Sequence, residues 1–339
     1  MIDCRALAAL ILALTFSWQV SRADQIMVVN GDRLTGKVVS KSGDTLKFRT
    51  DYAGEIAVQW TDVASITTDA PVTVMSADGE LKNVRLERAG SGSVELVSEG
   101  EAREIRLADL AHINPPPHVA GTGVSYKGRV SLLGSASRGN TDDSRLYGEA
   151  ELNARAKDYR YHLEGRAERK EEEGDTTEQN YYLAGRRDQL IDDKRFWYLR
   201  SSLEHDEVKD IKVRAAAGAG LGWNLIDTSK TQFTVRGGLD YVLARRDVVP
   251  DETYPAIGWG INYSHWFWTD RLEYFFDQSG FASLTSGGDV SVRTRTGVRL
   301  PMGSGLSANA QINIDYEGDP GPNHDKTDTT LLLGLGYDF

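Results

Sequence analysis

Polar and apolar residues alternate with a period of two over the last two-thirds of the chain. The segment 329–339 is the clearest example, because one face carries Thr329, Leu331, Leu333, Leu335, Tyr337 and Phe339. The opposite face is small or polar except at Leu332. Successive side chains of a β-strand point to opposite faces, so this pattern predicts strands rather than helices. Twelve strands are predicted, over 124–137, 143–156, 159–170, 178–190, 195–206, 211–225, 231–245, 253–268, 271–283, 288–300, 305–317 and 327–339.

The connections between these predicted strands alternate in length. Short connections lie at 157–158, 191–194, 227–230, 269–270 and 301–304, whereas longer and more charged ones lie at 171–175, 247–252 and 318–326. Outer-membrane barrels have short periplasmic turns and long external loops, and an even strand count returns both chain ends to the periplasmic side. Residues 118–339 are therefore predicted to form an all-β, transmembrane antiparallel β-barrel of about 12 strands, with ten or fourteen strands as alternatives.

The first 23 residues are typical of an export signal. Arg5 precedes an apolar run over 6–16, and Ser21 and Ala23 are small residues at the −3 and −1 positions of a cleavage site after Ala23. The apolar run is shorter than the ~20 residues of a spanning helix. The single cysteine, Cys4, lies inside this segment, so the mature chain is expected to have no disulfide and no cysteine-ligated metal.

Residues 24–114 contain an internal repeat with an offset of 47, because the segment 60–66 (WTDVASI) resembles 107–113 (LADLAHI). Each copy has turn signals and short alternating strands. Each also ends on two apolar residues spaced three apart, which fits a short helical turn or a bent last strand. We expect a small all-β periplasmic module of two five-stranded repeats of the SH3 or Sm type, joined to the barrel by the proline linker 115–117. Such a module is either a spacer or plug-like support, or a periplasmic binding module.

Composition and charge limit the class of protein and the kinds of partner that are expected. No internal run of about 20 apolar residues exists and the mean hydropathy is −0.42, which excludes a helical membrane protein but not a barrel, whose strands expose only alternate residues to lipid. The 34 glycines suit crowded strands, and the 14 tyrosines and 7 tryptophans suit interfacial girdles. Without Asp3, Arg5 and Arg22, 37 basic residues face 49 acidic ones, so the surface repels phosphate backbones and nucleic acid is not an expected partner.

The predicted inward face of the barrel carries charges of both signs. The lumen-lining candidates are Arg293, Arg295, Arg299, Arg236, Asp240, Glu149, Glu151, Glu164, Arg166 and Asp315. Three of these arginines follow one face of the predicted strand 288–300 and would form a positive stripe. Either opposed charges pair and fill the lumen, because an unpaired buried charge is costly, or the lumen stays open and selects small solutes by charge.

Other chemistry is weakly supported, and we expect no enzyme activity, no metal and no cofactor. The segment 218–222 (GAGLG) resembles a nucleotide-binding loop but lies in an alternating strand, where small residues ease barrel curvature. Ser264 and His265 are consecutive and point to opposite faces, so they cannot pair as nucleophile and base. Weak candidates for cation binding, favoured less than solvated surface, are 171–175, 205–206 and 324–325.

Three segments resemble a known family: 134–142 (GSASRGNTD), 200–204 (RSSLE) and 334–339 (GLGYDF). They are similar to family 481 of outer-membrane proteins of unknown function, often labelled salt-induced outer membrane proteins. A terminal aromatic residue on an amphipathic strand, here Phe339 with Tyr337, also resembles the outer-membrane assembly signal. The resemblance implies an outer-membrane location, with lipid, lipopolysaccharide and the assembly machinery as partners, but implies no established activity.

Two functional hypotheses follow from these observations. The first is a structural outer-membrane barrel or a narrow channel for small solutes or ions, which the family resemblance links to envelope or salt stress. The second is a membrane-anchored interaction protein, whose periplasmic repeat module docks a periplasmic protein partner in the envelope. They differ in whether the lumen is open or filled, and in whether the module has a ligand.

Overall fold

The computed structural model describes residues 23–90, 92–98, 100–137, 143–172, 175–207, 209–247, 250–268, 271–285, 290–320 and 325–339. Residues 1–22 of the predicted export signal lie outside this part of the chain, as do residues 138–142 of the family-like segment, Glu173 and His324. The chain divides into two compact units, Met1–Pro116 and Pro117–Phe339, which are described in turn.

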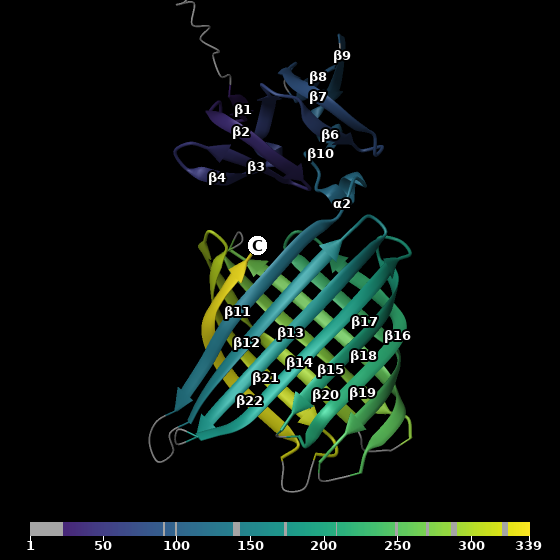
Figure 1. The fold of residues 1–339 in the computed structure, drawn as a ribbon. Helices are drawn as coiled ribbons and strands as arrows, with labels where there is room; N and C mark the ends of the chain where they lie inside the picture. Colours follow the sequence, from purple (N-terminus) through teal and green to yellow (C-terminus); the bar gives the residue numbers. More distant parts are fainter. Residues whose placement is uncertain are drawn as a thin grey trace, which may run out of the picture. The chain divides into compact units, whose positions relative to one another are not determined.

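The N-terminal unit is a ten-stranded antiparallel sheet made of two copies of one five-strand pattern (Figure 1). The first copy contains β1 (Asp24–Val28), β2 (Arg33–Ser42), β3 (Thr45–Thr50), β4 (Gly54–Gln59) and β5 (Val63–Thr67). The second contains β6 (Val72–Ser76), β7 (Leu81–Arg88), β8 (Ser93–Ser98), β9 (Glu101–Arg106) and β10 (Leu110–Ile113). In each copy the first four strands pair in chain order and the last strand returns to the first, β5 to β1 and β10 to β6.

A 3₁₀ turn precedes the last strand of each copy, η1 at Trp60–Asp62 and η2 at Leu107–Asp109. The repeated apolar residues therefore follow a helical turn and lie on a strand. The two turns meet, because Trp60 Nε1 donates to the carbonyl oxygen of Leu107, its equivalent 47 residues on, at 3.1 Å. Lys41 of β2 crosses between the copies, with Nζ donating to Leu110 O at 2.5 Å and to Ala111 O at 2.9 Å. Burial lowers the pKa of this Lys41 ammonium.

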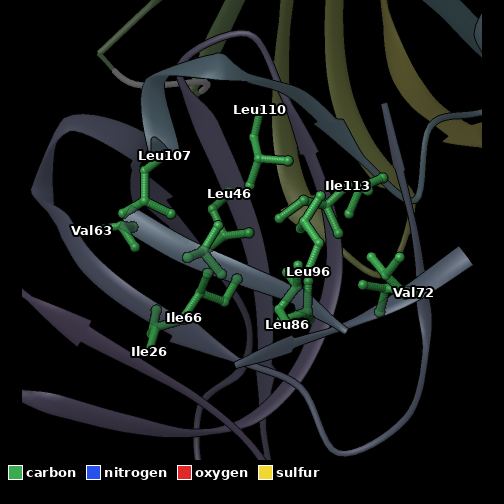
Figure 2. Packing of buried hydrophobic residues seen from close by; sticks show 14 of the residues in the cluster. Ile26, Leu46, Val63, Ile66, Val72, Leu86, Leu96, Leu107, Leu110 and Ile113 are labelled. Atoms are coloured by element: carbon green, nitrogen blue, oxygen red, sulfur yellow. The ribbon is translucent and has the colours of Figure 1, made fainter. Parts of the chain in front are cut away.

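The two copies share one hydrophobic core (Figure 2). Ile26, Leu46 and Ile66 of the first copy belong to the same buried cluster as Leu86 and Leu110 of the second. A chain of about 45 residues buries little apolar surface by itself. The two copies are joined in one sheet, where β10 pairs with β2, and their apolar residues form one larger core. The repeats therefore form one folding unit.

The C-terminal unit begins with the short helix α2 (Pro117–Ala120) and continues as a closed barrel of twelve antiparallel strands (Figure 1). The strands are β11 (Ser125–Ser137), β12 (Asp143–Arg155), β13 (Tyr159–Glu172), β14 (Asp175–Leu190), β15 (Arg195–Asp206), β16 (Ile211–Asp227), β17 (Thr231–Arg245), β18 (Glu252–Phe267), β19 (Leu272–Ser283), β20 (Val290–Gly303), β21 (Leu306–Glu317) and β22 (Thr327–Asp338). Each strand pairs with the next, and β22 closes the barrel on β11. The predicted twelve-strand barrel is confirmed.

The alternation on β22 places apolar residues outside the barrel. Leu333 is 61% exposed, whereas Leu332, the predicted exception, is 0% exposed and packs inside with Leu133 and Tyr147. One predicted connection is wrong, because β13 reaches Glu172 and β14 begins at Asp175, so most of the expected loop 171–175 belongs to strands. Among the described residues, no helix is both long and apolar enough to cross a membrane.

Candidate functional site in the barrel lumen

The lumen of the barrel is shaped by glycines that face large side chains. A Cβ on Gly220 would lie 2.7 Å from the hydroxyl of Tyr198, and one on Gly222 would overlap the ring of Phe196. Strand β16 thus lies close to bulky residues of β15 because it lacks side chains at these positions. The glycines of segment 218–222 leave space for large neighbouring side chains. Their presence is explained by this packing and does not require a bound nucleotide.

Arg295 of β20 lies at the centre of an ion-pair cluster in the lumen. Its guanidinium is 2.8 Å from Glu149, 3.1 Å from Glu151, 3.6 Å from Glu164 and 3.7 Å from Asp277. The side chain is only 4% exposed. A charge this deeply buried is costly unless opposite charges compensate it, and here four carboxylates surround it. Glu149, Glu151 and Glu164 were predicted on the inward face, whereas Asp277 was not among the predicted residues.

Arg293 forms a second cluster one inward position away on β20. It pairs with Glu204 at 2.5 Å and with Asp315 at 3.3 Å. Its guanidinium also stacks 4.3 Å from the ring centroid of Tyr182, and Arg166 approaches the same ring at 4.9 Å. Tyr182 therefore contacts two arginines, each of which gains a cation–π contact in addition to its carboxylate.

Glu204 joins several strands and one turn of the barrel. Besides Arg293 it pairs with Arg214, at 2.8 Å, which in turn pairs with Glu317 at 2.9 Å. Lys209, in the turn between β15 and β16, is buried and lies 2.9 Å from Asp206 and 3.9 Å from Glu204. Sequence reasoning missed Lys209 because a residue in a turn carries no period-two signal. Arg214 could have been found, since it shares the inward face of its strand.

Arg299 does not join the clusters of Arg293 and Arg295. It pairs with Glu273 at 3.1 Å and stacks 3.7 Å from the ring of Phe275. Arg129 of β11 lies 3.6 Å from the same Glu273 and 2.6 Å from Asp338 of β22. The predicted positive stripe along β20 is therefore divided among separate groups of carboxylates.

Asp240 and Arg236 of β17 have different surroundings. Asp240 accepts two hydrogen bonds from Arg200, at 2.8 and 2.6 Å. Arg236 donates to Asn262 Oδ1 at 2.5 Å, and among the described residues no carboxylate oxygen lies within 4.0 Å of its guanidinium. Arg236 is thus held by a neutral amide, whereas Arg293, Arg295 and Arg299 are held by carboxylates.

Two cavities remain inside the barrel. The first has a volume of about 170 Å³ and the second about 130 Å³. Five residues line both of them and therefore lie between them; we call this set the central layer: Arg166, Tyr182, Glu204, Arg293 and Arg295. These two spaces in the lumen therefore share a wall that consists of four ion-paired side chains and Tyr182.

Comparison with protein families matches residues 130–339 to the family described as "Protein of unknown function, DUF481". The chain belongs to this family. No curated protein matches the chain significantly. With a closed twelve-stranded barrel whose outer face carries exposed apolar side chains, this DUF481 chain has the architecture of an outer-membrane β-barrel protein.

Solved structures resemble this DUF481 member only weakly. The NanC porin is 10% identical with a TM-score of 0.42, over 62% of this chain and 98% of that one. The KdgM porin is 8% identical with a TM-score of 0.34, over 62% and 99%. The translocator domain of autotransporter NalP from Neisseria meningitidis is 13% identical with a TM-score of 0.35, over 65% and 89%. These likenesses say nothing about what the chain binds.

The remaining sequence candidates in this DUF481 chain have ordinary partners. His265 Nδ1 lies 2.8 Å from the hydroxyl of Thr231, on the face opposite Ser264. His205 donates from Nδ1 to the carbonyl oxygen of Lys212 at 2.9 Å. In the expected acidic loop, Glu172 pairs with Lys170 at 2.5 Å. Within the described part of the chain, no three metal-ligating side chains form a group.

Proposed function

We propose that the barrel rests in a closed state and serves as a structural outer-membrane anchor for the N-terminal module, not as an open diffusion pore. The central layer carries this proposal. Its ion pairs do not run along one wall of the barrel but join opposite walls. Arg295 on β20 reaches Glu149 on β12, although β21, β22 and β11 separate the two strands. Arg293 on β20 reaches Glu204 on β15, with four strands between them on the shorter path.

The free-energy cost of separating these ion pairs favours the closed state of the lumen. Removing one partner of a buried ion pair costs about 3–5 kcal/mol, because the other charge is left without compensation. Opening the lumen separates several such pairs at once, unless water enters to solvate them. A twelve-stranded barrel is narrow enough for long side chains to fill it, so the closed arrangement needs no separate plug domain.

The cavities on either side of the central layer favour a second function, a narrow channel for small ions or solutes. The central layer lines both spaces. A movement of this layer would widen the passage between them. The closed anchor and the gated channel therefore differ in whether this layer moves under physiological conditions.

Single-channel recording in planar bilayers tests the closed state. We expect the full chain to show no sustained current and Tyr182→Ala to show resolvable steps, because the change opens space in the central layer without removing a charge. Tyr181→Ala is the matched control, since Tyr181 is the preceding residue and lies exposed on the outer face. Sustained current through the unmodified chain would contradict the closed anchor and support the channel.

We infer from the barrel topology on which side of the membrane the N-terminal module lies. Strand β11 begins, and β22 ends, at the barrel end that also carries the short connections 156–158, 191–194, 228–230 and 304–305. Short connections are periplasmic in outer-membrane barrels. This supports a periplasmic location for the N-terminal module, which precedes β11 in the chain.

The edges of the module favour the interaction hypothesis. Strands β4 and β9 are the two ends of the sheet path. Strand β9 (EAREIR) is strongly charged, which protects an edge from pairing, whereas β4 (GEIAVQ) has Glu55 as its single charge. Glu55 is itself paired with Lys47 at 3.4 Å. An extended, weakly charged segment of a periplasmic partner could add to β4 as a further strand.

A photo-crosslinking amino acid at Ala57 tests this docking mode in the full chain in cells. Ala57 lies exposed on β4, and Ala102, exposed on β9, is the matched control position. We expect one discrete adduct from position 57 that is absent from position 102. It should disappear when Gln59 is replaced by proline, because N–H groups alternate along the strand: Trp60 N–H donates inward to Asp44 O, so that of Gln59 faces the free edge. Equal adducts from both positions, or none from either, would contradict docking on β4.

A further inference from the structure

We propose that the first cavity binds a small oxyanion, a carboxylate or inorganic phosphate, against Arg236 with Arg186 and Arg200 beside it. All three arginines line this cavity. This proposal goes beyond the proposed function, because a closed lumen does not by itself require a bound anion.

The first support is the incomplete pairing of Arg236. A guanidinium has five N–H donors in a planar fork that matches the two oxygens of a carboxylate or phosphate. The acceptor next to Arg236 is the neutral amide oxygen of Asn262, at 2.5 Å. The amide nitrogen of Asn262 donates to Asp277, so the amide stands between the arginine and that carboxylate. Every other arginine that lines this cavity has a carboxylate within 4.0 Å.

The second support is the charge balance around Arg236. Arg186 and Arg160 share the carboxylate of Asp188, at 2.8 and 2.5 Å. In the described part of the barrel, Asp240 has no other cationic partner than Arg200. Together with Arg236, four guanidinium groups thus face two carboxylates, and the group carries a net charge of +2. Uncompensated charge inside a membrane-embedded lumen is costly, so a bound anion stabilises the arrangement.

The third support is that the cavity wall is built to hold these groups. A Cβ on Gly260 would lie 2.5 Å from Nη2 of Arg236, and one on Gly258 would overlap the guanidinium of Arg200. The two glycines leave room for the guanidinium groups against β18. The cavity volume of about 170 Å³ is comparable to the ~150 Å³ that holds a benzene molecule in an engineered protein cavity. An acetate or phosphate ion therefore fits.

Thermal unfolding of the full chain in phospholipid-free detergent micelles tests the proposal. Phosphate or acetate is titrated against chloride at constant ionic strength, so that general salt effects cancel. We expect the Tm of the unmodified chain to rise with the logarithm of the oxyanion concentration, because a ligand that binds only the folded state stabilises it by mass action. Whether phosphate, acetate or both produce the rise identifies the class of anion.

Two variants distinguish the site from a general effect. Arg236→Gln should lose the oxyanion-dependent rise in Tm, and in chloride alone it should be at least as stable as the unmodified chain, because a repulsive charge is gone. Arg187→Gln is the control, since Arg187 stacks outside the lumen group on Tyr159 and Trp197, with 5.9 and 5.8 Å to the ring centroids. An equal rise in both variants, or no rise in the unmodified chain, would overturn the proposal.

Discussion

Replacing Phe339 with aspartate is expected to reduce the folded barrel in the outer membrane to a small fraction of the wild-type amount. Strand β22 closes the barrel on β11 through a short register that runs from Arg129↔Asp338 to Gly134↔Leu333. By contrast, the neighbouring β11·β12 register runs from Ser125↔Arg155 to Ser137↔Asp143. The seam is the shortest pairing in the barrel wall, so it depends most on each contact it has.

Phe339 extends this seam beyond the paired strands. Its N–H donates to the carbonyl oxygen of Gly128 at 3.0 Å, and Gly128 N–H donates to Phe339 O at 2.9 Å. The ring covers Gly128 so closely that a Cβ there would overlap it. Gly128→Val should therefore reproduce part of the Phe339→Asp defect from the other side of the seam, because the new side chain displaces the ring.

The shift in electrophoretic mobility between heated and unheated samples of outer-membrane fractions measures assembly. Phe339→Trp, which keeps an aromatic ring, is the control and should assemble normally. Normal amounts of heat-modifiable barrel from Phe339→Asp would show that neither the terminal aromatic residue nor its seam contacts are needed for assembly.

The strands and their faces were predictable from the sequence because lipid imposes a simple rule. Every second residue of a strand in the bilayer must be apolar, and Leu331, Leu333 and Leu335 obey this while Leu332 turns inward. The rule fails where a strand leaves the apolar layer. Glu171 and Glu172 belong to β13 although both faces of that stretch are charged, so hydropathy suggested a loop.

The partners inside the lumen were not predictable in the same way. Period-two alternation places Arg293, Arg295 and Arg299 on one face but cannot say which distant strand each one meets. Strand tilt places them at different depths, so Arg295 meets β12 and β13 whereas Arg299 meets the adjacent β19. The sequence left open whether the lumen was filled or open, because that choice depends on the reach of side chains across the barrel.

The strands of the N-terminal unit could also be predicted from the sequence, whereas its shared core could not. The offset of 47 indicated two copies with the same strands, and each copy has them. A sequence repeat does not show how its copies pack against each other. Trp60 and Leu107 are equivalent positions of the two copies, and their contact cannot be read from the repeat.

Replacing Arg295 with methionine is expected to cause the largest loss of stability in the barrel. The methionine fills similar space but leaves Glu149, Glu151, Glu164 and Asp277 facing one another without the guanidinium, and removing one side of a buried ion pair costs about 3–5 kcal/mol. Urea unfolding of the purified barrel in lipid vesicles, followed by tryptophan fluorescence, measures the free energy of unfolding. Arg299→Met is the comparison and should lose less, because Glu273 keeps Arg129 within 3.6 Å.

A second substitution separates charge from packing at this position. If the loss arises from uncompensated carboxylates, Glu149→Gln added to Arg295→Met should restore part of the stability, because it removes one of the facing charges. The two changes should then be non-additive, as expected for residues within one ion-pair cluster. Additive losses would mean that Arg295 stabilises the lumen mainly by filling it, and the ion pairs across the central layer would then no longer explain why the barrel stays closed.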